Sequence, residues 1–565
     1  SEPHEAGRIG ADAHDSLSSG RRASDPNEGA RVLKPIMVAI LVGAEDGSPR
    51  FSEYSPGLFL YTLHPILIRG RISRIFPAAA SLKNKGNRYM CTSLIAGEKA
   101  TVDGSFIVAR SADSAAIKAQ HFVRHPARQG QKGIYSTKAH GGVNDFTYPL
   151  PENSLAFTTI PFWKTQLHGA AGFNEAGLGL TGTESIFASE AALAVDPYVK
   201  ETGITEDDIA DVLLSRCRTA REGAMTLGAI IEEKGAGEGF GVAFVDQSEV
   251  WYLETGSGHQ WLAQRTPAEK YFASGNQGRF QDYDPESSDM MASKTLVQFA
   301  IEKGLYNPEK DGAFNFSKAY TRDDDRDRIY NDPRVWVMQK YFNPSLVQDP
   351  QAGRTFPVYL VPEKKVTVED AKAMMRDHFE GTEHDPYSKG LRGDEPWRPI
   401  SVFRTYEAHV LQVRPWLPKE LGEVIYVAMG MADLSVFLPF YAGLSRSPES
   451  WTKGTDQGEA DSAYWKFRRV QTLAMTDYPK LAPIVKKTWA DFEADAKVRQ
   501  EAMEAKVLEL YEVDRAKALA ELEAFNLGLI AEAERTAEKL LEKLFVIRTV
   551  DIEAVVPAKN RKNKD

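Results

Sequence analysis

Three residues of this chain have side chains that together could make or break a covalent bond: Cys91, Arg110 and Asp113. The thiolate is the reactive form of cysteine, and a nearby cation such as a guanidinium stabilises it. A carboxylate within reach can fix the orientation of an amine or a base. If Cys91 became the first residue of the chain, its own α-amino group, with an unperturbed pKa of about 7.7–8, could serve as the general base.

The spacing of these residues predicts that they meet on a β-hairpin. Thr92–Ala96 and Phe106–Ala109 are short apolar runs of β-favouring residues, and an Asp-Gly turn signal lies between them. Antiparallel pairing about a turn near the midpoint would place Cys91 opposite Arg110 or Ser111. The thiol, the guanidinium and the carboxylate would then gather at one end of the two strands.

Burial is the alternative explanation for the cysteines. The chain has two of them, too few for a disulfide framework. Free cysteine is among the most buried residue types, so Cys91 could be a core residue, with Arg110 and Asp113 forming a weak ion pair on a surface turn. Cys217 lies in the helical-looking stretch Ile204–Thr219, where we expect a core residue. The sequence has no clustered Cys/His spacing that would indicate a zinc site.

A series of blocks in one order resembles the dipeptidase A family of cysteine peptidases, which belongs to the N-terminal nucleophile hydrolases and is related to the secernins. The first block runs from Cys91 to Asp113. The later blocks, in chain order, are Phe173–Leu178, Gly182–Ser185, Glu249–Glu254, Gly258–Trp261, Ala263–Arg265, Arg334–Trp336, Arg398–Ser401, Glu407–His409 and Pro439–Gly443. Several unconnected blocks in one order are much more specific than a single motif.

The resemblance implies a fold and the roles of several residues. The expected fold class is α+β, a four-layer αββα sandwich of two antiparallel sheets with helices added at the C-terminal end. Cys91 would be the nucleophile and Arg110 would favour its thiolate, while Asp113 would hold the α-ammonium group or position the substrate amine. A papain-like arrangement, in which His409 or His259 pairs with Cys91, is the alternative.

Three further residues are candidates for the site. An oxyanion hole needs a hydrogen-bond donor aimed at the developing negative oxygen. Asn276, after the short run Tyr271–Ala273, is the first candidate, because related N-terminal cysteine hydrolases carry an asparagine after a comparable strand. Asn174 is the second, through its side chain or backbone, and a turn residue is the alternative for both. Arg334 could bind a substrate carboxylate, bolster the charge of the site, or form a structural ion pair.

Composition divides the chain into four segments. Residues 1–90 are typical of a leader, a propeptide or a disordered extension, because the start is rich in Ser, Gly, Ala and charged residues. Within it, Ile36–Ala44 could be the core of a signal peptide. Residues 91–490 form the expected catalytic domain, with short strand patterns separated by Gly, Pro and Asn. Residues 491–550 predict a helical extension, and 551–565 a charged tail.

We expect a cysteine dipeptidase that cleaves dipeptides or short peptides without a metal or organic cofactor, activated when self-cleavage or another protease removes residues 1–90. An amidase or acylase acting on N-acyl amides, or a secernin-like regulator of secretion, is the alternative. The net charge of −10 and the pI of about 5.7 argue against nucleic acid and anionic membranes as partners. The C-terminal helical stripe could pack on its own domain or in a homo-oligomer. The expected location is cytoplasmic, with export as the alternative.

Overall fold

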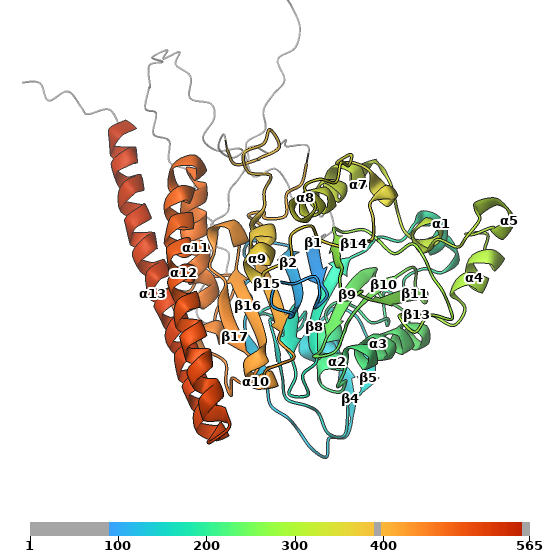
Figure 1. Ribbon diagram of the computed structural model, residues 1–565, viewed down its shortest axis with the longest axis horizontal. Helices are drawn as coiled ribbons and strands as arrows, with labels where there is room; N and C mark the ends of the chain where they lie inside the picture. Colours follow the sequence, from blue (N-terminus) through green and yellow to red (C-terminus); the bar gives the residue numbers. More distant parts are fainter. Residues whose placement is uncertain (1–89, 389–396, 556–565) are drawn as a thin grey trace, which may run out of the picture. The chain divides into compact units, whose positions relative to one another are not determined.

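The computed structural model describes residues 90–388 and 397–555. The expected leader over residues 1–90, apart from Met90, and its candidate signal core therefore lie outside the described residues. The last ten residues of the expected charged tail lie outside them as well. Within the described ranges, the predicted α+β class with antiparallel sheets is confirmed (Figure 1).

The larger sheet has seven strands, and every neighbouring pair in it is antiparallel. The nucleophile candidate lies on one of its interior strands. In spatial order the strands are β14 (Tyr359–Leu360), β12 (Tyr271–Ser274), β1 (Met90–Ala96), β2 (Phe106–Asp113), β15 (Thr405–Val413), β16 (Glu423–Met429) and β17 (Leu438–Tyr441).

The second sheet has six strands and is also antiparallel throughout. Its spatial order is β13 (Met290–Ala292), β11 (Trp261–Arg265), β10 (Val250–Thr255), β9 (Phe240–Val245), β8 (Gly179–Ser185) and β7 (Ala171–Phe173). Two short pairs accompany it: β3 (Val123–His125) with β6 (Phe157–Thr159), and β4 (Ile134–Ser136) with β5 (Thr147–Pro149).

Helices surround the sheets. The short ones are α1 (Glu190–Val195), α2 (Ile209–Leu214), α4 (Leu296–Glu302), α5 (Pro308–Asp311), α6 (Phe316–Tyr320), α7 (Asp325–Tyr330), α9 (Val368–Arg376) and α10 (Lys419–Gly422). The longer ones are α3 (Ala220–Lys234), α8 (Asp332–Phe342), α11 (Ala463–Met475), α12 (Tyr478–Tyr511) and α13 (Arg515–Val555). The helices α2 and α3 contact the second sheet, while α9, α11 and α13 contact the larger one.

The two sheets contact each other where β1 and β2 meet β8. All eight residues of β2 are buried, and so are all six of β9 and of β10. Strands covered on both faces are expected to be almost continuously apolar rather than alternating. Because β2 nevertheless carries Arg110 and Asp113 into this interior, both charges need partners inside the protein.

The helical-looking stretch Ile204–Thr219 contains only the short α2. The next helix, α3, begins at Ala220, because the side chain of Thr219 accepts a hydrogen bond from the Glu222 amide and caps it. Cys217 lies between the two helices and is buried, as predicted for a core residue.

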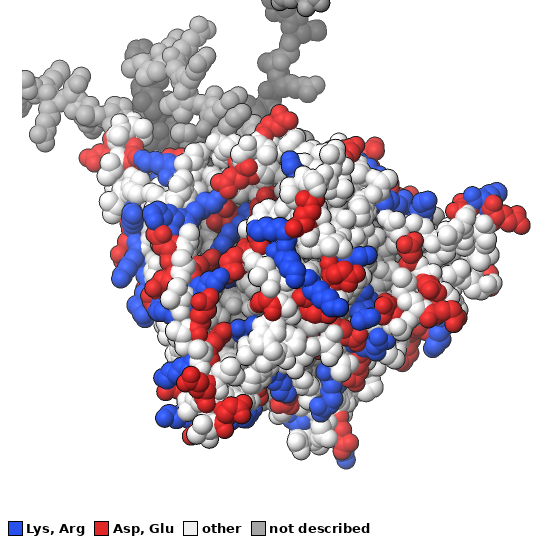
Figure 2. All heavy atoms as spheres, in the orientation of Figure 1, with Lys and Arg blue, Asp and Glu red and all other residues white. Residues whose placement is uncertain are grey.

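Two long helices, α12 and α13, run side by side along the larger sheet (Figure 1). The predicted boundary at residue 491 falls inside α12, so the helical region continues across it. Buried residues of α13 recur at helical spacing, among them Leu522, Leu529, Ala533, Leu540 and Leu544. Figure 2 shows Lys and Arg mixed with Asp and Glu on this face. None of the helices within the described ranges combines the length and apolarity that crossing a membrane requires.

One buried carboxyl group generates a prediction about stability. Glu423, at the start of β16, is 0% exposed, and neither of its carboxyl oxygens has a hydrogen-bond partner among the described residues. Burial raises the pKa of Glu423 to about 8. An unfolded glutamate titrates near pH ~4.3. Between these two pH values Glu423 binds more protons in the folded protein than in the unfolded chain. The free energy of unfolding therefore falls as the pH rises through this range.

We expect Glu423→Gln to raise the free energy of unfolding relative to the original protein, by about 3–4 kcal/mol more at pH 8 than at pH 5. Glutamine keeps the shape of the side chain and removes its titration. Urea unfolding at the two pH values measures the difference. Glu542→Gln, at an exposed position of α13, is the control and should give no such change. If the free energy of unfolding had the same pH dependence in both variants, the raised pKa of Glu423 would be contradicted.

Candidate active site

The thiol of Cys91 lies in direct contact with the guanidinium of Arg110. Arg110 Nη1 donates to Cys91 Sγ at 3.0 Å, and each residue is 1% exposed. Charged donors make stronger hydrogen bonds than neutral ones, and this one favours the thiolate over the thiol. The meeting of these two groups, predicted from their spacing, is present in the structure.

The strand register differs slightly from the predicted one. Cys91 pairs with Ala112, while Arg110 pairs with Ser93. The predicted partners, Arg110 and Ser111, are thus two positions and one position away, respectively, from the observed partner. Residues two apart on a strand share a face, so Arg110 still projects on the same side as Cys91, diagonally across the pair. Ser111 belongs to the opposite face.

Arg110 is held by the second sheet. Its Nε donates to Thr181 Oγ1 at 3.0 Å, and its Nη2 donates to the carbonyl oxygens of Ala170 and Gly182 at 3.1 and 2.8 Å. Burial by itself lowers the pKa of Arg110, but the nearby Cys91, Tyr406 and glutamates outweigh it and raise the pKa above its usual range. The guanidinium therefore stays charged beside the sulfur at any relevant pH.

Asn276 supplies a polar side chain next to the backbone of Cys91. It follows β12, the strand that pairs with β1 on the side away from β2. Its Oδ1 accepts from the Cys91 amide at 3.2 Å and from Arg334 Nη2 at 2.9 Å. Its Nδ2 is buried and has no hydrogen-bond partner among the described residues. With the oxygen occupied, the amide group presents an unused donor beside the nucleophile.

Arg334 is an internal support of this region. It lies on α8, is 0% exposed, and donates through Nη1 to the Cys91 carbonyl at 2.5 Å and to Thr92 Oγ1 at 2.7 Å. Its Nη2 also donates to Asn331 Oδ1 at 2.6 Å. Of the roles expected for Arg334, supporting the site agrees with these contacts, and binding a substrate carboxylate does not.

Asp113 lies at the same end of the hairpin as Cys91. Its strand partner is Met90, and its carboxylate accepts from Arg398 and from Thr405 Oγ1. In this chain, where Met90 is still attached, the Cys91 amide donates to Asn276 rather than to Asp113. Arg398 lies in a sequence block that matched the family pattern, but no role was expected for it.

The contacts of Asn174 do not favour its predicted role as an oxyanion donor, because all of its donors already have acceptors. Its Nδ2 donates to the carbonyl oxygens of Leu214 and Cys217, and its Oδ1 accepts from the amides of Ala176 and Leu178. Its backbone amide donates to the Leu178 carbonyl. Its Oδ1 and backbone amide shape the turn between β7 and β8, and its Nδ2 joins this turn to the end of α2. These contacts agree with the turn residue that was the alternative.

The two histidines considered for a papain-like pair have other partners. His409 Nε2 contacts Thr181 Oγ1 at 2.7 Å, and its Nδ1 contacts Glu407 Oε2 at 2.8 Å. His259 Nδ1 contacts Asp196 Oδ1 at 2.8 Å. Sequence patterns alone do not point to Thr181, because its importance comes from the contact between the two sheets.

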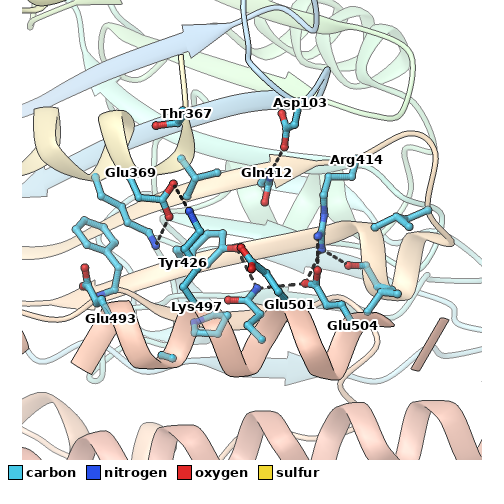
Figure 3. A pocket seen from close by; sticks show the side chains of 18 of the residues that line it. Asp103, Thr367, Glu369, Gln412, Arg414, Tyr426, Glu493, Lys497, Glu501 and Glu504 are labelled. Atoms are coloured by element: carbon cyan, nitrogen blue, oxygen red, sulfur yellow. Dashed lines mark hydrogen bonds and ion pairs between the residues drawn. The ribbon is translucent and has the colours of Figure 1, made fainter. Parts of the chain in front are cut away.

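A cavity of about 520 Å³ lies between α12, α9 and the larger sheet (Figure 3). None of the candidate site residues lines it. Its charged groups pair with one another, as Arg414 does with Glu504 at 2.7 Å and Lys497 with Glu369 at 3.5 Å. The hydrogen-bonded geometry around the sulfur, rather than this cavity, therefore locates the candidate site.

Among the residues that the structure describes, one group of side chains has the types that ligate metals: His378, Glu380 and Asp433, whose ligand atoms lie within 4.8 Å of one another. Lys486 Nζ lies 2.6 Å from Asp433 and 3.2 Å from Glu380. The ammonium group already supplies the positive charge that these carboxylates need. This cluster is therefore explained as a structural ion group, separate from Cys91.

Comparison with known proteins gives consistent matches. The profile described as Peptidase family C69 matches residues 90–491. A probable dipeptidase of Salmonella dublin is 51% identical over 383 residues, which cover 67% of this chain and 86% of that protein. A probable dipeptidase A of Streptococcus pyogenes serotype M18 is 33% identical over 416 residues, covering 70% and 84%. A solved penicillin V acylase from Agrobacterium tumefaciens is 11% identical with a TM-score of 0.28, over 62% of this chain and 86% of that one, a likeness too weak to argue from.

The contacts of Arg334 predict a large effect on stability. Arg334→Met should lower the free energy of unfolding by about 3 kcal/mol, because each buried acceptor left without a donor costs roughly 1–3 kcal/mol. Urea unfolding measures this loss. The control is Arg326→Met, since the side chain of Arg326 on α7 is 59% exposed and should matter by less than about 0.5 kcal/mol. Similar losses in both variants would show that the buried network does not stabilise the fold.

Proposed function

The chain belongs to peptidase family C69, a family of peptide-bond hydrolases, and on that premise we propose that it is a cysteine dipeptidase whose nucleophile is Cys91. The Salmonella and Streptococcus relatives carry the names of dipeptidases, and this favours short peptides over N-acyl amides as substrates. The observation that carries the proposal is the hydrogen bond from Arg110 to the Cys91 sulfur, with Asn276 on the other side of the same residue.

The proposed chemistry uses two groups of one residue. The α-amino group of Cys91 takes the thiol proton, the resulting thiolate attacks the peptide carbonyl carbon, and the ammonium group passes the proton to the leaving nitrogen as the C–N bond breaks. The resulting thioester is then hydrolysed by water, with the same amine as general base. Arg110 contributes by keeping the sulfur anionic before the attack.

Asn276 is the proposed oxyanion donor. The tetrahedral intermediate places a negative charge on the former carbonyl oxygen, and a fixed donor stabilises it most when it needs no rearrangement. The Nδ2 of Asn276 fulfils this condition, because Arg334 and Cys91 hold the opposite end of the amide. Arg334 thereby acts as a positioning residue for Asn276.

Asp113 is proposed to receive the α-ammonium group after maturation. It pairs with Met90, the residue whose carbonyl is joined to the Cys91 nitrogen. Removing residues 1–90 would leave this carboxylate at the end of β1 where the new positive charge forms. The family match begins at residue 90, which supports a working enzyme that starts at Cys91. The finer fold proposal is the αββα sandwich of N-terminal nucleophile hydrolases.

The main test compares the two cysteines of the chain. Cys91→Ala should abolish turnover of a panel of dipeptides, whereas Cys217→Ala should keep nearly all of it. Burial raises the pKa of Cys217 to about 11, so this thiol is the matched unreactive control. Intact-mass measurement of each preparation shows which residue begins the chain. Undiminished turnover by Cys91→Ala, or full activity in a chain that begins upstream of Cys91, would refute the proposal.

The two asparagines give a second contrast. Asn276→Ala should lower kcat by roughly 10²–10³-fold with little change in KM, as expected for the loss of one oxyanion donor. Asn174→Ala should instead lower the unfolding midpoint while the folded fraction keeps its kcat. Steady-state kinetics and urea unfolding of both variants separate the two effects. A loss of kcat in Asn174→Ala without a loss of stability would reverse the assignment.

A further inference from the structure

A group of hydrogen-bonded side chains, completed by one longer ion pair, lies next to Arg110. Thr181 Oγ1 contacts both Arg110 Nε, at 3.0 Å, and His409 Nε2, at 2.7 Å. His409 Nδ1 contacts Glu407 Oε2 at 2.8 Å. Glu407 Oε1 lies 4.0 Å from Arg110 Nη2, which returns the chain of contacts to the guanidinium. These side chains come from β2, β8 and β15, so two sheets contribute to the group.

The donors and acceptors of this group can be ordered along the chain. A guanidinium only donates, so the Thr181 oxygen accepts from Arg110. The hydroxyl hydrogen of Thr181 then has two acceptors, His409 Nε2 at 2.7 Å and the Ala170 carbonyl at 3.4 Å, and the shorter contact is the better bond. His409 Nε2 therefore accepts, and Nδ1–H donates to the carboxylate of Glu407. This assignment fixes a neutral tautomer of His409.

Burial supports the neutral form. Thr181 is 3% exposed, and Glu407 and His409 are both 0% exposed. Burial lowers the pKa of His409, although Glu407 beside it raises the pKa in part. A second positive charge next to Arg110 would also be unfavourable. The group is thus a buried polar network that each added proton would disturb.

We infer that Glu407, His409 and Thr181 are positioning residues, which hold the guanidinium of Arg110 against the sulfur of Cys91 through this ordered chain of hydrogen bonds. The inference rests on the proposed function, and it gives a role to the Glu407–His409 block. None of the three side chains needs to touch the substrate. They act by limiting the orientations of Arg110, because a guanidinium with a fixed Nε–H has a fixed direction for Nη1.

There are two alternatives. His409 could belong to a passive core, or it could act directly as a base on Cys91. A passive core would tolerate the loss of the Thr181 hydroxyl with no change at the sulfur. A direct base would be insensitive to Thr181 but would lose activity when His409 is replaced. The three arrangements therefore predict different results for the same small set of variants.

The experiment measures the rate of Cys91 alkylation by iodoacetamide against pH, with mass mapping to separate Cys91 from Cys217. Thr181→Val should raise the apparent pKa of the Cys91 thiol by about one unit, which lowers the alkylation rate near neutral pH by about tenfold. Its kcat should fall with KM almost unchanged. Thr181→Ser keeps the hydroxyl and should restore both values. Ser111→Ala removes a different buried hydroxyl, on β2, and should change neither the thiol pKa nor kcat.

His409→Leu breaks the same chain from its other side and should shift the thiol pKa in the same direction as Thr181→Val. If Thr181→Val does not fold, as judged by urea unfolding, the thiol pKa of His409→Leu tests the inference instead. A wild-type thiol pKa in the folded variants, or equal shifts in Thr181→Ser and Thr181→Val, would overturn the inference. The alkylation readout needs no dipeptide turnover, so failure of the proposed function would show separately in the Cys91→Ala comparison.

Discussion

The structure around the candidate site depends on one buried positive charge. A guanidinium taken out of water is tolerated only when nearly all of its donors find acceptors. Arg110 finds them on both sheets: the sulfur of Cys91 on its own sheet, and a hydroxyl and two carbonyl oxygens on the other. The side chain that contacts the thiol therefore also joins the two sheets, so the environment of the sulfur and the packing of the sheets are not independent here.

The hairpin and the meeting of Cys91 with Arg110 could be predicted because both follow from local patterns. Short apolar runs with a turn between them determine pairing, and pairing determines which side chains share a face. The observed partner of Cys91 is one position from Ser111 and two from Arg110, and the even offset leaves Arg110 on the same face as Cys91. Thr181 could not be predicted, because it becomes important only through contact between strands that are distant in sequence.

Asn174 and Asn276 illustrate the same limit. Both are asparagines near the end of a strand or turn, and the local sequence does not distinguish their roles. Tertiary structure does so through the number of acceptors each amide meets. Asn174 has two carbonyl oxygens for its two hydrogens, whereas Asn276 has its oxygen occupied and its nitrogen unused. The oxyanion candidate is identified by an unmet donor, a property that no single-residue pattern encodes.

The position of β1 inside its sheet has a consequence for any enzyme that works from its first residue. A newly cut terminus ordinarily frays, because few contacts restrain it. Here β1 pairs with β2 along its whole length and with β12 from Ser93 to Ala96, and Arg334 of α8 donates to the carbonyl of Cys91. Cutting the chain before Cys91 would create an end that β2 and Arg334 already hold in place, so maturation would require no later folding step to aim the new amine.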